Sequence, residues 1–185
     1  MTHQTLLTGN VLLCTNDPFV DAEGVRIAAD HGVLIEDARI VATGAADTLR
    51  DQSPHVQEYA YGNRLIIPGF VDSHAHYPQT AMIASWGMRL IDWLNTYTFP
   101  EEAKFGDCGY AGEVAGRYLD LVLANGTTTV ASYTTIHAGS VDAFFEAAAA
   151  RNMRVVAGKT CMDRNAPDDL RDSAQSAYDD SKALI

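Results

Sequence analysis

The chain has 185 residues, of which 47% are hydrophobic and 20% charged, a composition typical of a globular protein with a sizeable core. Its net charge of −11 repels phosphate backbones, so we expect no nucleic-acid partner. No apolar run approaches the roughly 18 residues of a membrane helix and no signal peptide is visible, so we expect no membrane partner. Three widely spaced cysteines, Cys14, Cys108 and Cys161, fit neither a disulfide framework nor a zinc motif and favour the cytoplasm.

The first 67 residues predict a small unit of short strands and turns. Residues 6–15 alternate loosely and contain Gly9-Asn10, a dipeptide typical of a turn. Residues 31–44 predict a hairpin whose turn is the acidic pair Glu36-Asp37. Residues 45–52 predict a short helix, after which β character returns at residue 61.

From Phe70 onward, predicted strands alternate with predicted helices. Residues 106–126 show helical periodicity, with Asp107 as the N-cap and Gly126 at the end. The next helix covers 139–153 and has Ser140 as its expected cap, and a third begins with Pro167 in its first turn. Residues 70–76, 127–135 and 154–162 read as strands, and a long loop follows the first of them.

This alternation implies an α/β fold with a parallel sheet and right-handed crossovers. Three strand–helix units are too few for a closed (β/α)₈ barrel, which typically needs around 250 residues. The sequence also stops inside the apolar helical stretch "SKALI". We therefore expect these residues to be the N-terminal part of a longer protein.

The stretch "PGFVDSHAHYPQT", residues 68–80, carries the strongest chemical signal. His74 and His76 lie two residues apart at the carboxyl end of a predicted strand, so both imidazoles should share one face. Imidazole is a good ligand for zinc, nickel and ferrous iron. Asp72 would lie on the same face as an orienting acceptor or an indirect ligand, and Gln79 would offer an amide to a substrate.

An isolated His-x-His pair is weak support for a metal site, because most such pairs are surface or satisfied polar residues. The context strengthens it, since the pair follows an apolar run and a Pro-Gly break and opens the alternating region. Parallel α/β folds place their chemistry at this end of the strands.

"PGFVDSHAH" resembles the PGxxDxHxH strand of the metal-dependent amidohydrolase superfamily. "DWLNTYTFPEE", "NGTTTVASYTTIH" and "VVAGKTCMD" further resemble its guanine deaminase branch. The resemblance implies an incomplete (β/α)₈ barrel over residues 68–185, preceded by part of a small β-sandwich over residues 1–67. It implies that His74 and His76 are metal ligands and that His76 and Gln79 face the substrate.

The resemblance also implies a function for the full-length protein, namely zinc-dependent hydrolytic deamination of guanine to xanthine and ammonia. One Zn²⁺ per subunit, with iron as an alternative, and a homodimer are expected. The remaining ligands and the catalytic Glu and Asp would follow Ile185, so the 185 residues alone should be inactive. Two alternatives stay open: an amidohydrolase acting on another amino- or chloro-substituted heterocycle or cyclic amide, and a non-catalytic barrel scaffold.

Several other residues attract attention. Lys159 is the central residue of a Gly-Lys-Thr sequence that resembles the end of a phosphate loop. Position 153 is Met153 where a phosphate loop needs glycine, so a structural or pocket-lining role is favoured. His137 is either a loop residue near a helix cap or a group close to the substrate. Trp93 and Trp86 could stack on a planar ring or only anchor the long loop.

Cys161 is expected to be a small buried residue on the third of these strands, because a free cysteine commonly packs as a hydrophobe.

Overall fold

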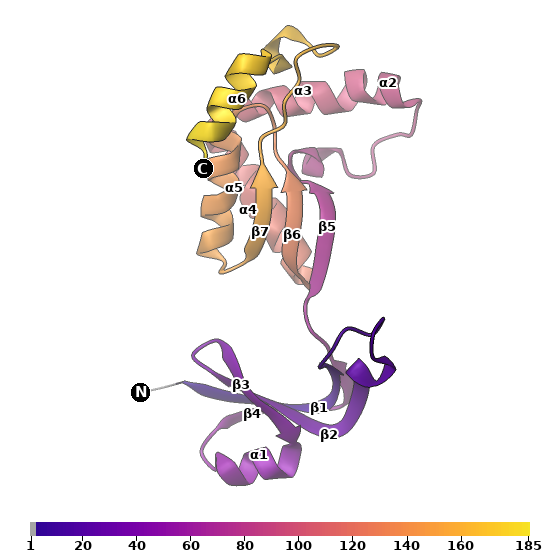
Figure 1. Ribbon diagram of the computed structural model, residues 1–185, viewed down its shortest axis with the longest axis vertical. Coiled ribbons are helices and arrows are strands. Elements are labelled where there is room, and N and C mark those ends of the chain that lie inside the picture. The colour runs from indigo at the N-terminus through magenta and orange to yellow at the C-terminus, as the bar shows by residue number, and fades with distance from the viewer. Residues whose placement is uncertain (1–2) are drawn as a thin grey trace. The chain divides into compact units, whose positions relative to one another are not determined.

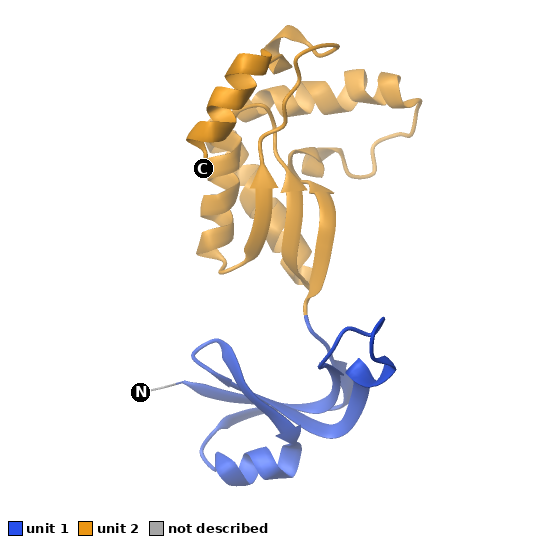
Figure 2. Ribbon diagram, in the orientation of Figure 1, with its two compact units in different colours: residues 1–68 blue, residues 69–185 orange. Residues whose placement is uncertain are grey.

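The computed structural model describes residues 3–185, so Met1 and Thr2 of the expected first domain lie outside the described part. The chain divides into two compact units, Met1–Pro68 and Gly69–Ile185 (Figure 2). Each unit has its own sheet and its own core.

The first unit is a four-stranded sheet in the order β3-β2-β1-β4 (Figure 1). Strand β1 pairs antiparallel with β2 and parallel with β4, and β2 pairs antiparallel with β3. Leu6, Leu34 and Leu49 form its small core. The elements are β1 (Gln4–Cys14), a 3-10 turn η1 (Ala22–Gly24), β2 (Val25–Glu36), β3 (Arg39–Ala45), α1 (Ala46–Gln52) and β4 (Gln57–Ile66).

The structure confirms the hairpin and the short helix of this unit, but the hairpin turn is Asp37-Ala38, one residue later than expected, and Gly9-Asn10 is not a turn. Asp37 and Ala38 connect β2 to β3 with φ angles of 46° and 64°, as a tight hairpin turn requires. Strand β1 instead continues through Gly9 and Asn10, where its pairing register with both neighbouring strands shifts. Both residues therefore form a β-bulge, a feature that uses the same residue types as a turn.

The second unit is a parallel sheet in the order β5-β6-β7, with helices between its strands (Figure 1). Gly69 lies just before β5, and only glycine fits there, because a Cβ atom would lie 2.2 Å from the Thr128 hydroxyl oxygen. This is the opening part of a (β/α)₈ barrel, as expected. The elements are β5 (Phe70–His76), α4 (Cys108–Ala124), β6 (Thr127–Tyr133), α5 (Ala138–Ala150), β7 (Arg154–Gly158) and α6 (Ala174–Ala183).

The two faces of this sheet differ in burial. Val130 of β6 is fully buried and packs in one cluster with Leu119 of α4 and Phe144 of α5. Tyr133 and Val156 point away from that cluster and are 48% and 65% exposed. The helix-covered face is thus the core, and the other face is the one that a closed barrel would turn inward.

Helix boundaries agree with the sequence in one case and differ in two. Asp107 caps α4 by accepting hydrogen bonds from the backbone N–H groups of Gly109 and Tyr110. Helix α5 has His137, not Ser140, at its N-cap, because the Ser140 hydroxyl binds the Thr135 and His137 backbone. Pro167 instead precedes a short 3-10 turn, η5 (Asp168–Leu170), and α6 begins only at Ala174.

The long loop after β5 contains short helical segments that follow one another closely. They are η2 (Tyr77–Met82), α2 (Leu90–Trp93), η3 (Leu94–Thr98), α3 (Phe99–Glu102) and η4 (Ala103–Gly106). No helix within residues 3–185 has both the length and the apolar character needed to cross a membrane.

Candidate metal and substrate site

A bulge near the end of β5 decides which side chains face the future barrel interior. Asp72 pairs with Val130 and Ala75 pairs with Ser132, so three steps along β5 match two steps along β6. Paired residues of a ladder share a face, which puts Asp72 on the helix-covered side with Val130. His76 pairs with Tyr133 and lies on the opposite face.

This register overturns the expectation that Asp72 shares a face with both histidines. The extra residue of the bulge interrupts strict alternation between Asp72 and His76. The Asp72 carboxylate accepts a hydrogen bond from the His74 backbone N–H at 3.0 Å. Asp72 therefore supports the bulged backbone and does not orient an imidazole.

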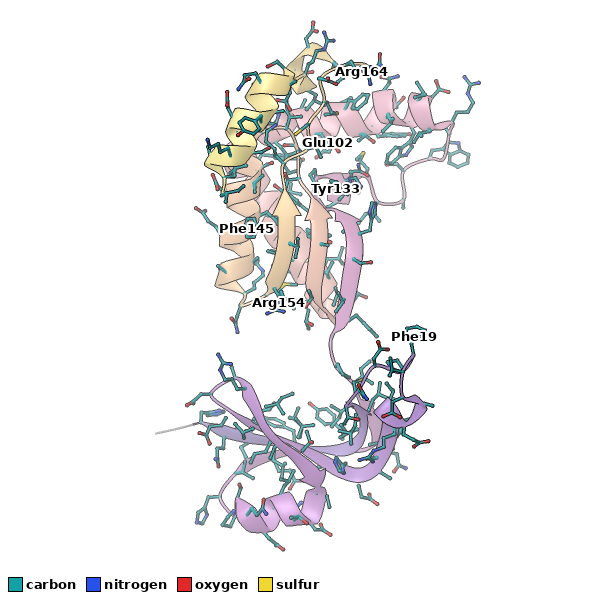
Figure 3. The ribbon with its side chains drawn as sticks, in the orientation of Figure 1. Phe19, Glu102, Tyr133, Phe145, Arg154 and Arg164 are labelled. Atoms are coloured by element: carbon teal, nitrogen blue, oxygen red, sulfur yellow. The ribbon has the colours of Figure 1, made fainter. Side chains whose placement is uncertain are left out.

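The two imidazoles do lie together, and an aromatic ring covers both. The ring centroids of His74 and His76 are 5.2 Å apart, with the planes inclined by 62°. The Tyr133 ring lies 4.9 Å from His76 and 5.5 Å from His74. Figure 3 shows Tyr133 at the end of the sheet to which the strand arrows point, the end where this fold places its chemistry.

Gln79 follows the strand on η2 and meets the site from the side of the loop. Its amide nitrogen lies 3.5 Å from His76 Nδ1 and donates to Glu102 Oε1 at 3.2 Å. His76, Gln79 and Trp93 contribute to the wall of a hollow of about 330 Å³. Trp93 also contacts Tyr97, whereas Trp86 is 82% exposed and lies outside this hollow.

Glu102 is a residue of the site to which the sequence assigned no role. It closes the stretch "DWLNTYTFPEE" and is only 6% exposed. Burial raises the pKa of its carboxyl group, and the hydrogen bond from Gln79 partly opposes that effect. The one available signal was a pair of adjacent acidic residues that ends a segment rich in aromatic side chains.

Burial lowers the pKa of His76, and the neighbouring His74 lowers it further. A lowered pKa favours the neutral imidazole, which is the form that binds a metal ion. The two rings side by side therefore fit two positions of a metal shell. Within residues 3–185, no group of three or more His, Cys, Asp or Glu side chains is arranged to hold an ion.

Lys159 directly follows β7, and His137 lies between β6 and α5. The Lys159 side chain is fully buried and forms an ion pair with Asp172 at 2.8 Å. It also takes part in lining a second hollow, with His74 and Tyr133. His137 Nε2 is buried and has no hydrogen-bond partner among the described residues. The expected structural or pocket-lining role of Lys159 agrees with this arrangement.

Cys161 does not behave as expected, because it lies beyond the end of β7 and is exposed. Cys14 and Cys108 are exposed too, and the structure shows all three thiols unpaired.

The fold and the histidine pair point to a class of protein: part of a (β/α) barrel with two imidazoles side by side at the end of its first strand. The chain belongs to the amidohydrolase family, whose profile matches residues 65–185.

Within this family, the chain is similar to guanine deaminases, both curated proteins and solved structures. A guanine deaminase of Escherichia coli (strain K12) is 43% identical over 171 residues, which are 92% of this chain and 39% of that protein. The structure of guanine deaminase from Bradyrhizobium japonicum is 36% identical with a TM-score of 0.89, covering 99% of this chain and 40% of that one.

The guanine deaminase of C. acetobutylicum, solved with guanine bound in its active site, is 31% identical with a TM-score of 0.82. The match covers 99% of this chain and 42% of that one. The 185 residues therefore span about two fifths of the length of the relatives they match.

Proposed function

We propose that the complete protein catalyses hydrolytic deamination of guanine to xanthine and ammonia with a bound divalent metal ion, most simply zinc. The observation that carries the proposal is the packing of His74 and His76, 5.2 Å apart, at the carboxyl end of β5. Similarity to guanine deaminases over nearly the whole chain supports the choice of substrate.

In this proposal the Nδ1 or Nε2 atoms of His74 and His76 would hold the ion. A zinc ion in such a site lowers the pKa of water and supplies a nucleophile at neutral pH. His76 is half-buried, which lowers the pKa of its imidazole and so favours the neutral form that can donate a lone pair to a metal ion. The stacked Tyr133 ring limits rotation of both imidazoles and so holds the pair in one orientation.

The hollow beside His76 is the proposed binding site for the purine ring. Gln79 would bind the substrate through its amide, and Trp93 would offer an apolar aromatic wall to a planar heterocycle. His76 borders the same hollow, so it would lie close to both the ion and the substrate.

The site formed by these 185 residues alone is incomplete in this proposal. A catalytic zinc site usually needs three protein ligands, and proton transfer to the leaving amine needs a carboxylate or a similar group. The described residues supply two imidazoles and no further group next to them that could complete a metal shell. We expect the isolated chain to bind zinc weakly and to leave guanine unchanged.

The test is guanine turnover, measured as ammonia release and as the change from guanine to xanthine absorbance. The complete protein loaded with zinc should be active, and removal of the metal by a chelator should abolish the activity. Xanthine formation by the isolated 185-residue chain would overturn the incomplete site. A metal-containing complete protein that deaminates or dechlorinates other heterocycles but not guanine would favour the alternative substrate class. A folded, metal-free protein would favour the scaffold.

A further inference from the structure

Two adjacent glutamates on α3 are equally buried but have different partners. Glu101 is 7% exposed and Glu102 is 6% exposed. The Glu101 carboxylate accepts from the Lys104 ammonium at 2.5 Å and from the Tyr110 hydroxyl. Glu102 has no ion pair within residues 3–185, and its single hydrogen-bond donor there is the Gln79 amide.

A buried carboxylate without a cation is costly for a fold, because its charge is removed from water without compensation. Glu102 therefore costs the fold stability, which suggests that its contact with Gln79 serves the site. Figure 3 shows Glu102 at the same end of the sheet as Tyr133, which contacts both histidines.

The contact fixes which end of the Gln79 amide faces which neighbour. Glu102 Oε1 is the acceptor of this hydrogen bond, so the amide meets it with its NH₂ end. That nitrogen donates to Glu102 at 3.2 Å and lies 3.5 Å from His76 Nδ1. The amide oxygen of Gln79 has no partner among the described residues and is not buried, and the residue lines the hollow next to Trp93.

We propose that Glu102 is a positioning residue that holds the Gln79 amide with its carbonyl oxygen toward the ligand. The site then presents an acceptor and selects a heterocycle with an N–H donor at that position. This deepens the proposed function, on which its kinetic test rests. Guanine carries N–H donors on both rings and on its exocyclic amine, so it meets this requirement.

Without Glu102, the amide could rotate by 180° and present its NH₂ group to the hollow. An amide in this orientation places a donor against the N–H donor of the ligand, and the hydrogen bond is lost. The role of Glu102 is thus indirect, and its effect should vanish when Gln79 cannot form the bond.

A double-mutant cycle on the complete, metal-loaded protein tests this dependence. Glu102→Gln should lower kcat/KM for guanine about tenfold, and Gln79→Ala should lower it by about the same factor or more. The double variant should be no worse than Gln79→Ala alone, within about twofold. Losses that multiply would show that Glu102 acts independently of Gln79 and would overturn the proposal.

Glu101→Gln is the matched control, because it removes a neighbouring buried carboxylate on the same helix. Its effect should multiply with that of Gln79→Ala. Glu102→Gln keeps the size of the side chain and removes a buried charge, so we expect it to fold. Zinc content should be equal in all variants, which separates an effect on the amide from damage to the histidine pair.

A measurement without turnover keeps the two proposals separate. In ¹⁵N–¹H spectra of the complete protein, the Gln79 side-chain amide signals should shift in Glu102→Gln and stay unchanged in Glu101→Gln. Unchanged signals in Glu102→Gln would overturn the role of Glu102 even in an active enzyme. A shift of these signals in a protein that fails to deaminate guanine would support the orientation of Gln79 and refute the proposed substrate.

Discussion

The imidazole of His76 stacks on the ring of Tyr133, with centroids 4.9 Å apart and planes inclined by only 26°. The two residues are partners in the β5–β6 ladder, so the contact is built into the strand register. Residues that fix the orientation of a metal-binding side chain commonly change metal affinity about tenfold or more when they are replaced.

We therefore expect Tyr133→Ala to lower zinc affinity of the complete protein about tenfold, because His76 gains rotational freedom. Tyr133→Phe should leave it nearly unchanged, since the ring is kept. Zinc affinity can be measured by competition with a coloured chelator. Val156→Ala, on the same exposed face of the next strand, is the control. Equal losses for Tyr133→Ala and Val156→Ala would contradict a specific role of the stack.

Replacing His74 by alanine should reduce zinc affinity of the complete protein by more than about 100-fold and abolish guanine turnover, because one of the two proposed ligands in this strand is lost. His31→Ala in β2 of the first unit should leave both unchanged. Metal content after dialysis and ammonia release are the two measurements. Stoichiometric zinc in His74→Ala would show that this residue is not a ligand.

Two neighbouring phenylalanines of α5 provide a matched pair for core stability. Phe144 is fully buried and stacks on Tyr77, with ring centroids 4.6 Å apart. Phe145, labelled on α5 in Figure 3, is 42% exposed. Phe144→Ala should lower the free energy of unfolding by about 3–5 kcal/mol, because it leaves a cavity in the core. Phe145→Ala should cost less than about 1 kcal/mol. Urea denaturation of both variants measures the two losses. Similar losses of unfolding free energy would contradict a core centred on Phe144.

The ion pair of Lys159 and Asp172 should respond to substitution in the manner of a buried pair. Lys159→Met leaves the Asp172 carboxylate buried without its cation and should cost about 3–5 kcal/mol. The double variant Lys159→Met/Asp172→Leu should cost less than the single one. Arg151→Met breaks an ion pair with Asp120, a largely exposed residue, and should cost less than about 1 kcal/mol. A double variant worse than Lys159→Met would contradict this account.

The first unit should lose stability in acid through Glu58. Hydrogen bonds from Arg50 and from Thr8 lower the pKa of Glu58 from its ordinary value of 4.5 to about 2. A carboxyl group whose pKa falls on folding stabilises the protein above its unfolded pKa, and this contribution disappears as the pH drops from about 5 to 2.

Glu58→Gln should therefore lower the free energy of unfolding by about 1 kcal/mol at pH 7 and flatten its decrease between pH 5 and pH 2. Asp51→Asn, on the neighbouring helix α1, should leave that pH dependence intact. Urea midpoints measured at several pH values provide the comparison. An equally steep decrease in Glu58→Gln would exclude Glu58 as its source.

Local signals in the sequence predicted the elements that depend on local chemistry. Asp107 could be predicted as a cap because its carboxylate accepts from backbone N–H groups in the first turn of α4, which directly follows it in the sequence. Ser140 was mistaken for a cap because its hydroxyl binds backbone groups before the helix, an arrangement that follows from the buried turn at Thr135. The pairing of His74 with His76 followed from the two-residue repeat of a strand, which holds over the last three residues of β5.

The parts that were missed depend on partners far along the chain. The register between β5 and β6 decides on which face of the sheet Asp72 lies, and the sequence of β5 alone does not predict that register. The contact between Gln79 and Glu102 joins residues 23 positions apart, across a loop whose short helices have weak sequence signals. Distances of this kind need the folded chain.

Tyr77, which directly follows His76, is held at three points. Its backbone N–H donates to the Ser132 hydroxyl, its own hydroxyl donates to the Ser140 carbonyl, and its ring is fully buried against Phe144. Separating this end of β5 from the sheet would disrupt the core. The backbone amides at this end of β5 should therefore exchange with solvent only through global unfolding. A ligand that enters the hollow beside His76 should therefore find this strand already fixed in place.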